Sequence, residues 1–85
     1  MEKIPVTFST NTFDYELIAR KKRKALYRQV QNGKVVGYEV HTIRIRDNQE
    51  ILPSNEDFGM FGWSYDKKED AVEKFEPLRR NTKTN

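Results

Sequence analysis

The clearest pattern in the chain is an alternation of apolar and polar residues in several short segments. Within residues 13–20, four apolar side chains fall on one face of an extended chain: Phe13, Tyr15, Leu17 and Ala19. Only Ile18 interrupts this period of two, which is typical of a half-buried strand. Residues 4–8 alternate more weakly, and both an edge strand and a flexible segment are compatible with them.

The dipeptide Asn32-Gly33 predicts a β-hairpin, because Asn-Gly readily takes positive φ at both positions of a type I′ turn. A two-residue loop pairs Gln31 with Lys34, Val30 with Val35, and Tyr27 with Tyr38. One face of this hairpin then holds Ala25, Tyr27, Val36, Tyr38 and Val40. We expect it to be the core face, because its two aromatic residues bury the larger area.

Beyond Val40 the alternation changes phase, since Ile43 and Ile45 have the opposite parity. A β-bulge near His41-Thr42 would return both isoleucines to the same core. Without a bulge, the two side chains cover the second face of the sheet.

The acidic, polar segment 47–57 contains Pro53 and predicts a loop, in which Ser54–Asp57 could form one capped helical turn. Residues 60–65 predict a further strand with Phe61, Trp63 and Tyr65 on one face. Such an aromatic stripe is either a binding platform or core beneath a helix, and its size and spacing favour core.

A short amphipathic helix is predicted after Asp66. Asp66 and Glu69 form a variant of the capping box. Four apolar residues follow at helical spacing: Ala71, Val72, Phe75 and Leu78. Pro77 should end the helix after about three turns. A helix this short needs to pack on the sheet to be stable.

Together these elements predict one α+β domain over residues 13–78. It consists of an antiparallel sheet of three to four strands, with one C-terminal α-helix packed on one face. Residues 1–12 are expected to be a flexible or edge-strand segment, and residues 79–85 a basic flexible tail. With 85 residues the chain is the size of a single small domain, so a few large side chains must dominate its core.

Composition indicates a soluble protein of a reducing compartment. The chain has no cysteine, so disulfides and thiolate chemistry are excluded. Residues 1–6 lack the apolar run of a signal peptide. No stretch approaches the roughly 20 apolar residues that span a bilayer. We therefore expect a cytoplasmic protein without membrane contact.

The charge is distributed unevenly along the chain. Residues 1–46 hold ten Lys/Arg and four Asp/Glu, a net charge of +6. Residues 47–78 hold three Lys/Arg and nine Asp/Glu, a net charge of −6. Residues 79–85 add three basic residues. The whole chain is therefore +3. A polarity of this kind bears on the choice of partners.

The basic residues are the candidate binding site, because phosphate contacts come mainly from such side chains. The full candidate set is Arg20, Lys21, Lys22, Arg23, Lys24, Arg28, Lys34, Arg44 and Arg46. Its centre is the run Arg20–Lys24, which we place at an exposed turn. Tyr15 or Tyr27 could stack on bases if either faces outward. The competing interpretation of the run is a solvated turn that keeps a small domain soluble.

Catalytic and metal-binding groupings are missing from the sequence. His41 is the only histidine, and a general base needs a partner and a pocket. No second His and no Cys can complete a zinc site, and the acidic clusters lack the oxygen spacing of a calcium loop. We therefore predict a protein that is not an enzyme and uses no metal or other cofactor.

Several specific motifs lie between Tyr38 and Phe75. They are Tyr38-Glu39-Val40, Pro53-Ser54-Asn55-Glu56-Asp57-Phe58-Gly59, Gly62-Trp63-Ser64-Tyr65, and the series Glu69, Ala71, Lys74 and Phe75. This stretch, roughly half of the chain, resembles short uncharacterised proteins of phages, prophages and mobile elements in Bacteroides-like bacteria. The resemblance implies a bacterial or phage cytoplasmic setting and no particular chemistry.

A second resemblance is architectural only. In WGR domains a small sheet precedes a helix, and basic and aromatic residues contact nucleic acid. The Trp-Gly-Arg triplet itself is absent from this chain.

Two functional hypotheses follow. In the first, a small accessory protein binds nucleic acid through the basic turn Arg20–Lys24. In the second, a phage or mobile-element protein binds a host protein through its acidic loop-and-helix half or a sheet edge. The sequence leaves the oligomeric state open.

Overall fold

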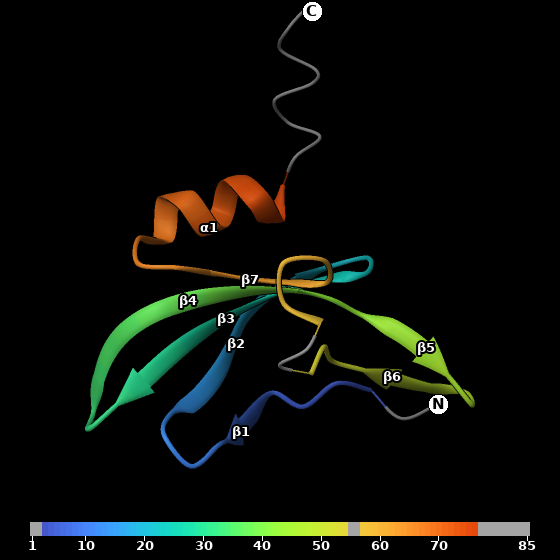
Figure 1. Ribbon diagram of the computed structural model, residues 1–85, viewed down its shortest axis with the longest axis horizontal. Coiled ribbons are helices and arrows are strands. Elements are labelled where there is room, and N and C mark those ends of the chain that lie inside the picture. Colours follow the sequence, from blue (N-terminus) through green and yellow to red (C-terminus); the bar gives the residue numbers. More distant parts are fainter. Residues whose placement is uncertain (1–2, 55–56, 77–85) are drawn as a thin grey trace, which may run out of the picture.

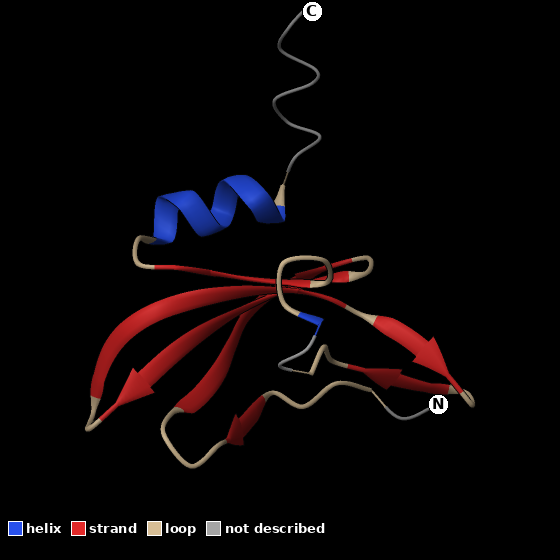
Figure 2. Cartoon of the chain, in the orientation of Figure 1, coloured by secondary structure: helices blue, strands red, loops and turns tan. Residues whose placement is uncertain are grey.

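The computed structural model describes residues 3–54 and 57–76. Within them, five strands form one antiparallel sheet in the order β1-β2-β3-β4-β7, and two more strands form a separate β5–β6 hairpin. The strands are β1 (Thr7–Ser9), β2 (Asp14–Lys21), β3 (Lys24–Gln31), β4 (Lys34–Thr42), β5 (Arg44–Arg46), β6 (Gln49–Ile51) and β7 (Gly62–Tyr65). The helix α1 (Lys68–Phe75) lies on one side of the curved sheet, and the β5–β6 hairpin lies on the other (Figures 1 and 2).

The α+β class and the C-terminal helix packed on the sheet are confirmed. The expected number of strands, three to four, is too small. The weakly alternating N-terminal segment supplies β1, which pairs Phe8 with Tyr15 of β2. The segment 47–57, predicted as a loop, contains strand β6. Its turn residues Asp47 and Asn48 both have positive φ, 52° and 62°, as a two-residue hairpin loop of type I′ requires.

The β3–β4 hairpin turns at Asn32-Gly33 as predicted, with φ of 54° and 77°. Its register follows the prediction for only two pairs, Gln31 with Lys34 and Val30 with Val35. A β-bulge then inserts one extra residue in β4, so that Gln29 pairs with Gly37 and Tyr27 with Glu39. The predicted pairing of Tyr27 with Tyr38 is therefore wrong, because one inserted residue moves every later side chain to the opposite face.

A second bulge lies in β2 and explains why Ile18 interrupts the alternation. Leu17 pairs with Tyr27, and Ala19 pairs with Leu26, which leaves Ile18 as the extra residue. Ile18 and Ala19 consequently pack on the helix side, whereas Leu17 packs on the other side. The prediction that Ala19 shares a face with Leu17 is wrong for this reason.

The two bulges give the sheet two apolar faces and hence two cores. The face away from the helix buries Ile4, Tyr15, Ala25, Tyr27 and Ile43. The helix side buries Leu26, Val40, Ala71 and Phe75, with Tyr38, Trp63 and Tyr65 packed against them. The single core face expected for the hairpin is thus divided between two cores, and Val36 is exposed.

Of the two predicted outcomes of the phase change after Val40, the second holds for Ile43 but not for Ile45. Strand β4 pairs with β3 without a bulge at His41-Thr42. Ile43 therefore lies in the core opposite the helix, beside Tyr27, and Ile45 is 41% exposed on the β5–β6 hairpin.

Trp63 and Tyr65 pack beneath α1, so for these two residues the interpretation of the aromatic stripe as core is confirmed, although Trp63 remains partly exposed. Phe61 lies just before β7 and is not part of this core. The helix is shorter than predicted. Its N-cap is Lys67 rather than Asp66, and no side chain caps it. The predicted stop at Pro77, the apolar contact of Leu78 and the tail 79–85 lie outside the described residues, as do the two central residues of the Ser54–Asp57 turn.

Candidate functional site

The candidate basic residues gather mainly at one end of the sheet. The β2–β3 turn is formed by Lys22 and Arg23, and the amide of Ile43 donates to the Arg23 carbonyl at 2.7 Å. This bond places Arg44, the first residue of β5, beside the turn, and Arg46 ends that three-residue strand. Lys34 begins β4 at the other end of the eight-residue strand β3, about 25 Å away at the usual rise per residue. Arg28 lies within β3.

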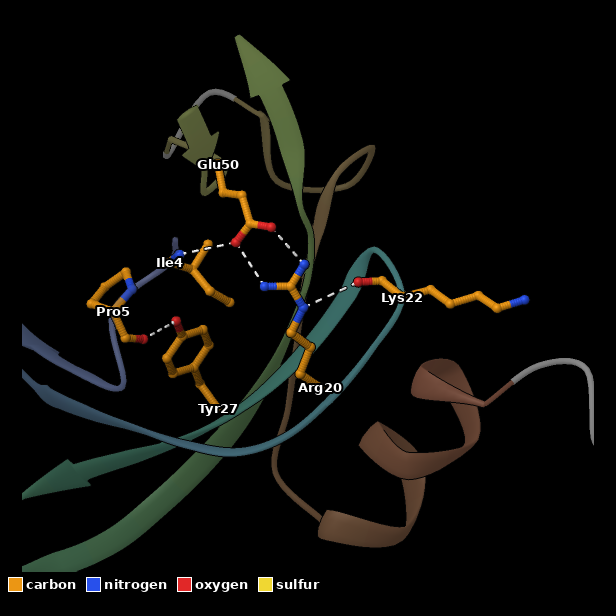
Figure 3. Close-up of polar contacts among 6 residues, drawn as sticks. All are labelled: Ile4, Pro5, Arg20, Lys22, Tyr27 and Glu50. Carbon is orange, nitrogen blue, oxygen red and sulfur yellow. Dashed lines mark hydrogen bonds and ion pairs between the residues drawn. The ribbon is translucent and has the colours of Figure 1, made fainter. Parts of the chain in front are cut away.

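Arg20 is part of the scaffold rather than a free cation. Its guanidinium donates two hydrogen bonds of 2.7 Å to the two carboxylate oxygens of Glu50 on β6, and its Nε donates to the Lys22 carbonyl at 3.2 Å (Figure 3). The Glu50 side chain is only 6% exposed and also accepts from the amide of Ile4 at 3.1 Å. The hydrogen bonds from Arg20 lower the pKa of Glu50 to about 2. This pair fixes the N-terminal segment and the β5–β6 hairpin to β2.

Three further candidates also have carboxylate partners. Arg28 pairs with Glu16 at 3.0 Å, Arg44 with Asp57 at 2.7 Å, and Lys21 with Glu76 at 3.9 Å. The Arg44 guanidinium also lies 4.4 Å from the centre of the Phe61 ring. Glu50, Asp57 and Glu76 all come from the acidic segment 47–78. Much of the charge polarity of the sequence is therefore neutralised within the molecule.

The remaining cations face solvent. Lys22, Arg23, Lys34 and Arg46 are exposed, and no carboxylate of the described residues lies within 4.0 Å of them. The Lys22 side chain extends away from the sheet (Figure 3). Lys22 has a φ of 55°, a left-handed conformation that is unusual for a residue with a side chain.

Two lysines lie over the single tryptophan on the helix side of the same end. The ammonium of Lys24 is 5.5 Å from the centre of the Trp63 ring, and that of Lys74 is 4.1 Å from it. Burial lowers the pKa of Lys24, and the positive charge of Lys74 lowers it further. We define the basic patch as Lys22, Arg23, Lys24, Lys74 and Trp63.

Sequence reasoning identified only part of the basic patch. It found the turn residues from their charge run, and it named Trp63 in an aromatic stripe for which a binding platform was the less favoured interpretation, but it missed Lys74. Trp63 and Lys74 join the turn only through the order of the strands and the position of the helix. The stacking role suggested for Tyr15 and Tyr27 is wrong, because these side chains are 7% and 0% exposed.

Among residues 3–54 and 57–76, no three His, Cys, Asp or Glu side chains are arranged to hold a metal ion. Within the same ranges, no helix has the length and apolar character needed to cross a membrane.

Comparison with known proteins adds no relative. No protein-family model, curated protein or solved structure matches the chain. Its function is therefore inferred from the geometry of its own residues.

Proposed function

We propose that the protein binds single-stranded nucleic acid through the basic patch. The carrying observation is the pair of ammonium groups, Lys24 and Lys74, held over the Trp63 ring. Burial is the main cause of the lowered pKa of Lys24, and repulsion by the like charge of Lys74 lowers it further. A phosphate oxygen between the two ammonium groups would relieve this repulsion, so the patch favours an anionic partner.

The exposed turn extends this anion site. Lys22 and Arg23 immediately precede Lys24, and no described carboxylate neutralises them. Lysine and arginine contacts to phosphates give affinity without sequence preference. The patch thus offers four cations along a path from the turn to the end of α1.

Trp63 gives the reason to favour a single strand. Its ring is partly exposed, and both lysines lie against it. A phosphate that draws one ammonium away from the ring leaves a ring face for an unstacked base. Aromatic faces bind bases of single strands in this way, with about 1–3 kcal/mol per base.

The alternative partner, a protein bound by the acidic half, has less support. Glu50, Asp57 and Glu76 of that half already pair with basic residues of the same chain.

Binding to a short oligothymidine, followed by fluorescence of the single tryptophan, tests the proposal. The variant Lys22→Gln/Arg23→Gln removes two phosphate contacts, so at about 0.15 M salt we expect affinity to fall about tenfold. The matched control Lys34→Gln/Lys68→Gln removes the same charge from two exposed positions outside the patch. Equal weakening by both double variants, or no binding by the wild type, contradicts the proposal.

A further inference from the structure

A second feature, unrelated to the basic patch, is a cavity of about 440 Å³ on the face of the sheet away from the helix. Residues of β1, β2, β4 and β7 and of the segment after β6 line it. Its apolar walls include Phe8, Tyr15, Leu52 and Phe58, and its polar groups include Glu39 and His41. This volume falls within the range of sites for small organic ligands.

Glu39 lines the cavity as a buried and fully hydrogen-bonded carboxylate. The residue is 6% exposed. Its Oε2 accepts from the Tyr15 hydroxyl at 3.2 Å, from Gln29 Nε2 at 3.2 Å and from the Ser64 hydroxyl at 3.4 Å. Its Oε1 lies 2.8 Å from His41 Nε2. Both oxygens of this buried carboxylate therefore have hydrogen-bond partners, as a buried polar group requires.

The Glu39 carboxylate determines which nitrogen of His41 carries hydrogen. A carboxylate can only accept, so Nε2 donates to it, and in the neutral ring Nδ1 then holds an unshared electron pair. His41 is 3% exposed, and its Nδ1 has no hydrogen-bond partner among the described residues. The rings of Tyr27 and Phe58, 5.1 Å and 5.6 Å from the imidazole between centres, contact it without offering a donor. A buried acceptor without a partner is unfavourable, and the fold retains one beside a cavity.

We propose that this cavity binds a small aromatic molecule with an amine or hydroxyl group, which donates a hydrogen bond to Nδ1 of His41. The aromatic and aliphatic walls receive the apolar body of the ligand. Among the residues that the structure describes, no lysine or arginine lines the cavity. Glu39 with His41 is negative or neutral in either protonation state of the ring, so the cavity favours neutral and cationic ligands over anions.

Three probes of similar shape and different charge test the proposal: benzylamine, benzyl alcohol and benzoate. The chain has one histidine, so both imidazole ¹⁵N resonances belong to His41. In the free protein we expect Nε2 to be protonated and Nδ1 to be an acceptor. Benzylamine and benzyl alcohol should shift the Nδ1 resonance to saturation, with benzoate binding at least about tenfold more weakly.

A variant adds a second readout. His41→Leu removes the acceptor and should weaken benzylamine about tenfold, whereas Lys34→Gln, outside the cavity, should leave its affinity unchanged. If His41→Leu does not fold, the resonances of the wild-type protein still decide the question. A protonated Nδ1 in the free protein, no shift of His41 with any probe at millimolar concentration, or benzoate binding as tightly as benzylamine would overturn the proposal.

Discussion

At the scale of single residues, the Arg20–Glu50 pair joins positions 30 residues apart in the chain. Glu50, which lies in β6, thereby links three segments, because its carboxylate accepts from Arg20 of β2 and from the amide of Ile4. The basic run Arg20–Lys24 therefore contains residues with different roles. Arg20 holds the N-terminal segment and the β5–β6 hairpin together, whereas Lys22 and Arg23 remain available for a partner.

The lowered pKa of Glu50 predicts a loss of stability in acid. Its ordinary pKa is 4.5, and in the folded protein it is about 2. The stabilisation from the ionised pair is therefore fully present above pH 4.5 and is lost as the pH falls from 4.5 towards 2. Glu50→Gln should lower Tm at pH 7, and the difference in Tm from the wild type should shrink over that interval. A difference that stays constant down to pH 2 would rule out this role for Glu50.

Gly37 predicts a packing effect beside the buried carboxylate. A Cβ at this position would lie 2.8 Å from Gln29 Oε1 and 3.2 Å from the Tyr65 carbonyl oxygen. Gly37→Ala should therefore displace Gln29 from Tyr15 and Glu39 and cost about 1–2 kcal/mol in the free energy of unfolding. Denaturant unfolding measures this cost. In a Gln29→Ala background it should be smaller, and an unchanged cost there would contradict the explanation.

At the scale of elements, the β2–β3 turn combines a strained backbone with exposed charge. Lys22 has a φ of 55°, and its charge lies between those of Lys21 and Arg23. Lys22→Gly should raise the free energy of unfolding by about 0.5–1 kcal/mol, because glycine accepts this conformation and removes one like charge. The same variant should bind oligothymidine more weakly. Unfolding in urea measures the change in the free energy of unfolding. A lower free energy of unfolding in Lys22→Gly would contradict this prediction and show that the lysine side chain stabilises the fold.

Strands with a clear local signal could be predicted from the sequence, and strands without one could not. Asn32-Gly33 identified the β3–β4 turn because only a few residue pairs take positive φ readily. The bulge at Val36 has no such signal, and the bulge at Ile18 shows in the sequence only as one interruption of the alternation. They follow from the need to bury apolar side chains on both faces, which depends on the whole sheet. Strand β6 was not predicted because it has only three residues, which are too few to show an alternation of apolar and polar side chains.

At the scale of the whole molecule, the charge split of the sequence has two outcomes. Part of it forms internal ion pairs, such as Arg20 with Glu50 and Arg44 with Asp57. The rest remains as the basic patch, where α1 meets the β2–β3 turn (Figure 1). Charge counting could not separate these outcomes, because partners distant in the sequence become neighbours only in the fold. For the same reason the cavity at Glu39 and His41 could not be predicted from the sequence.

The salt dependence of oligothymidine binding tests the central claim most directly. Four phosphate contacts at the basic patch predict that log K falls against log[salt] with a slope of about −3, since each contact to a single strand contributes about −0.7. In Lys22→Gln/Arg23→Gln the slope should be about −1.4. A slope near zero in the wild type, or the same slope in both proteins, would contradict nucleic-acid binding through this patch.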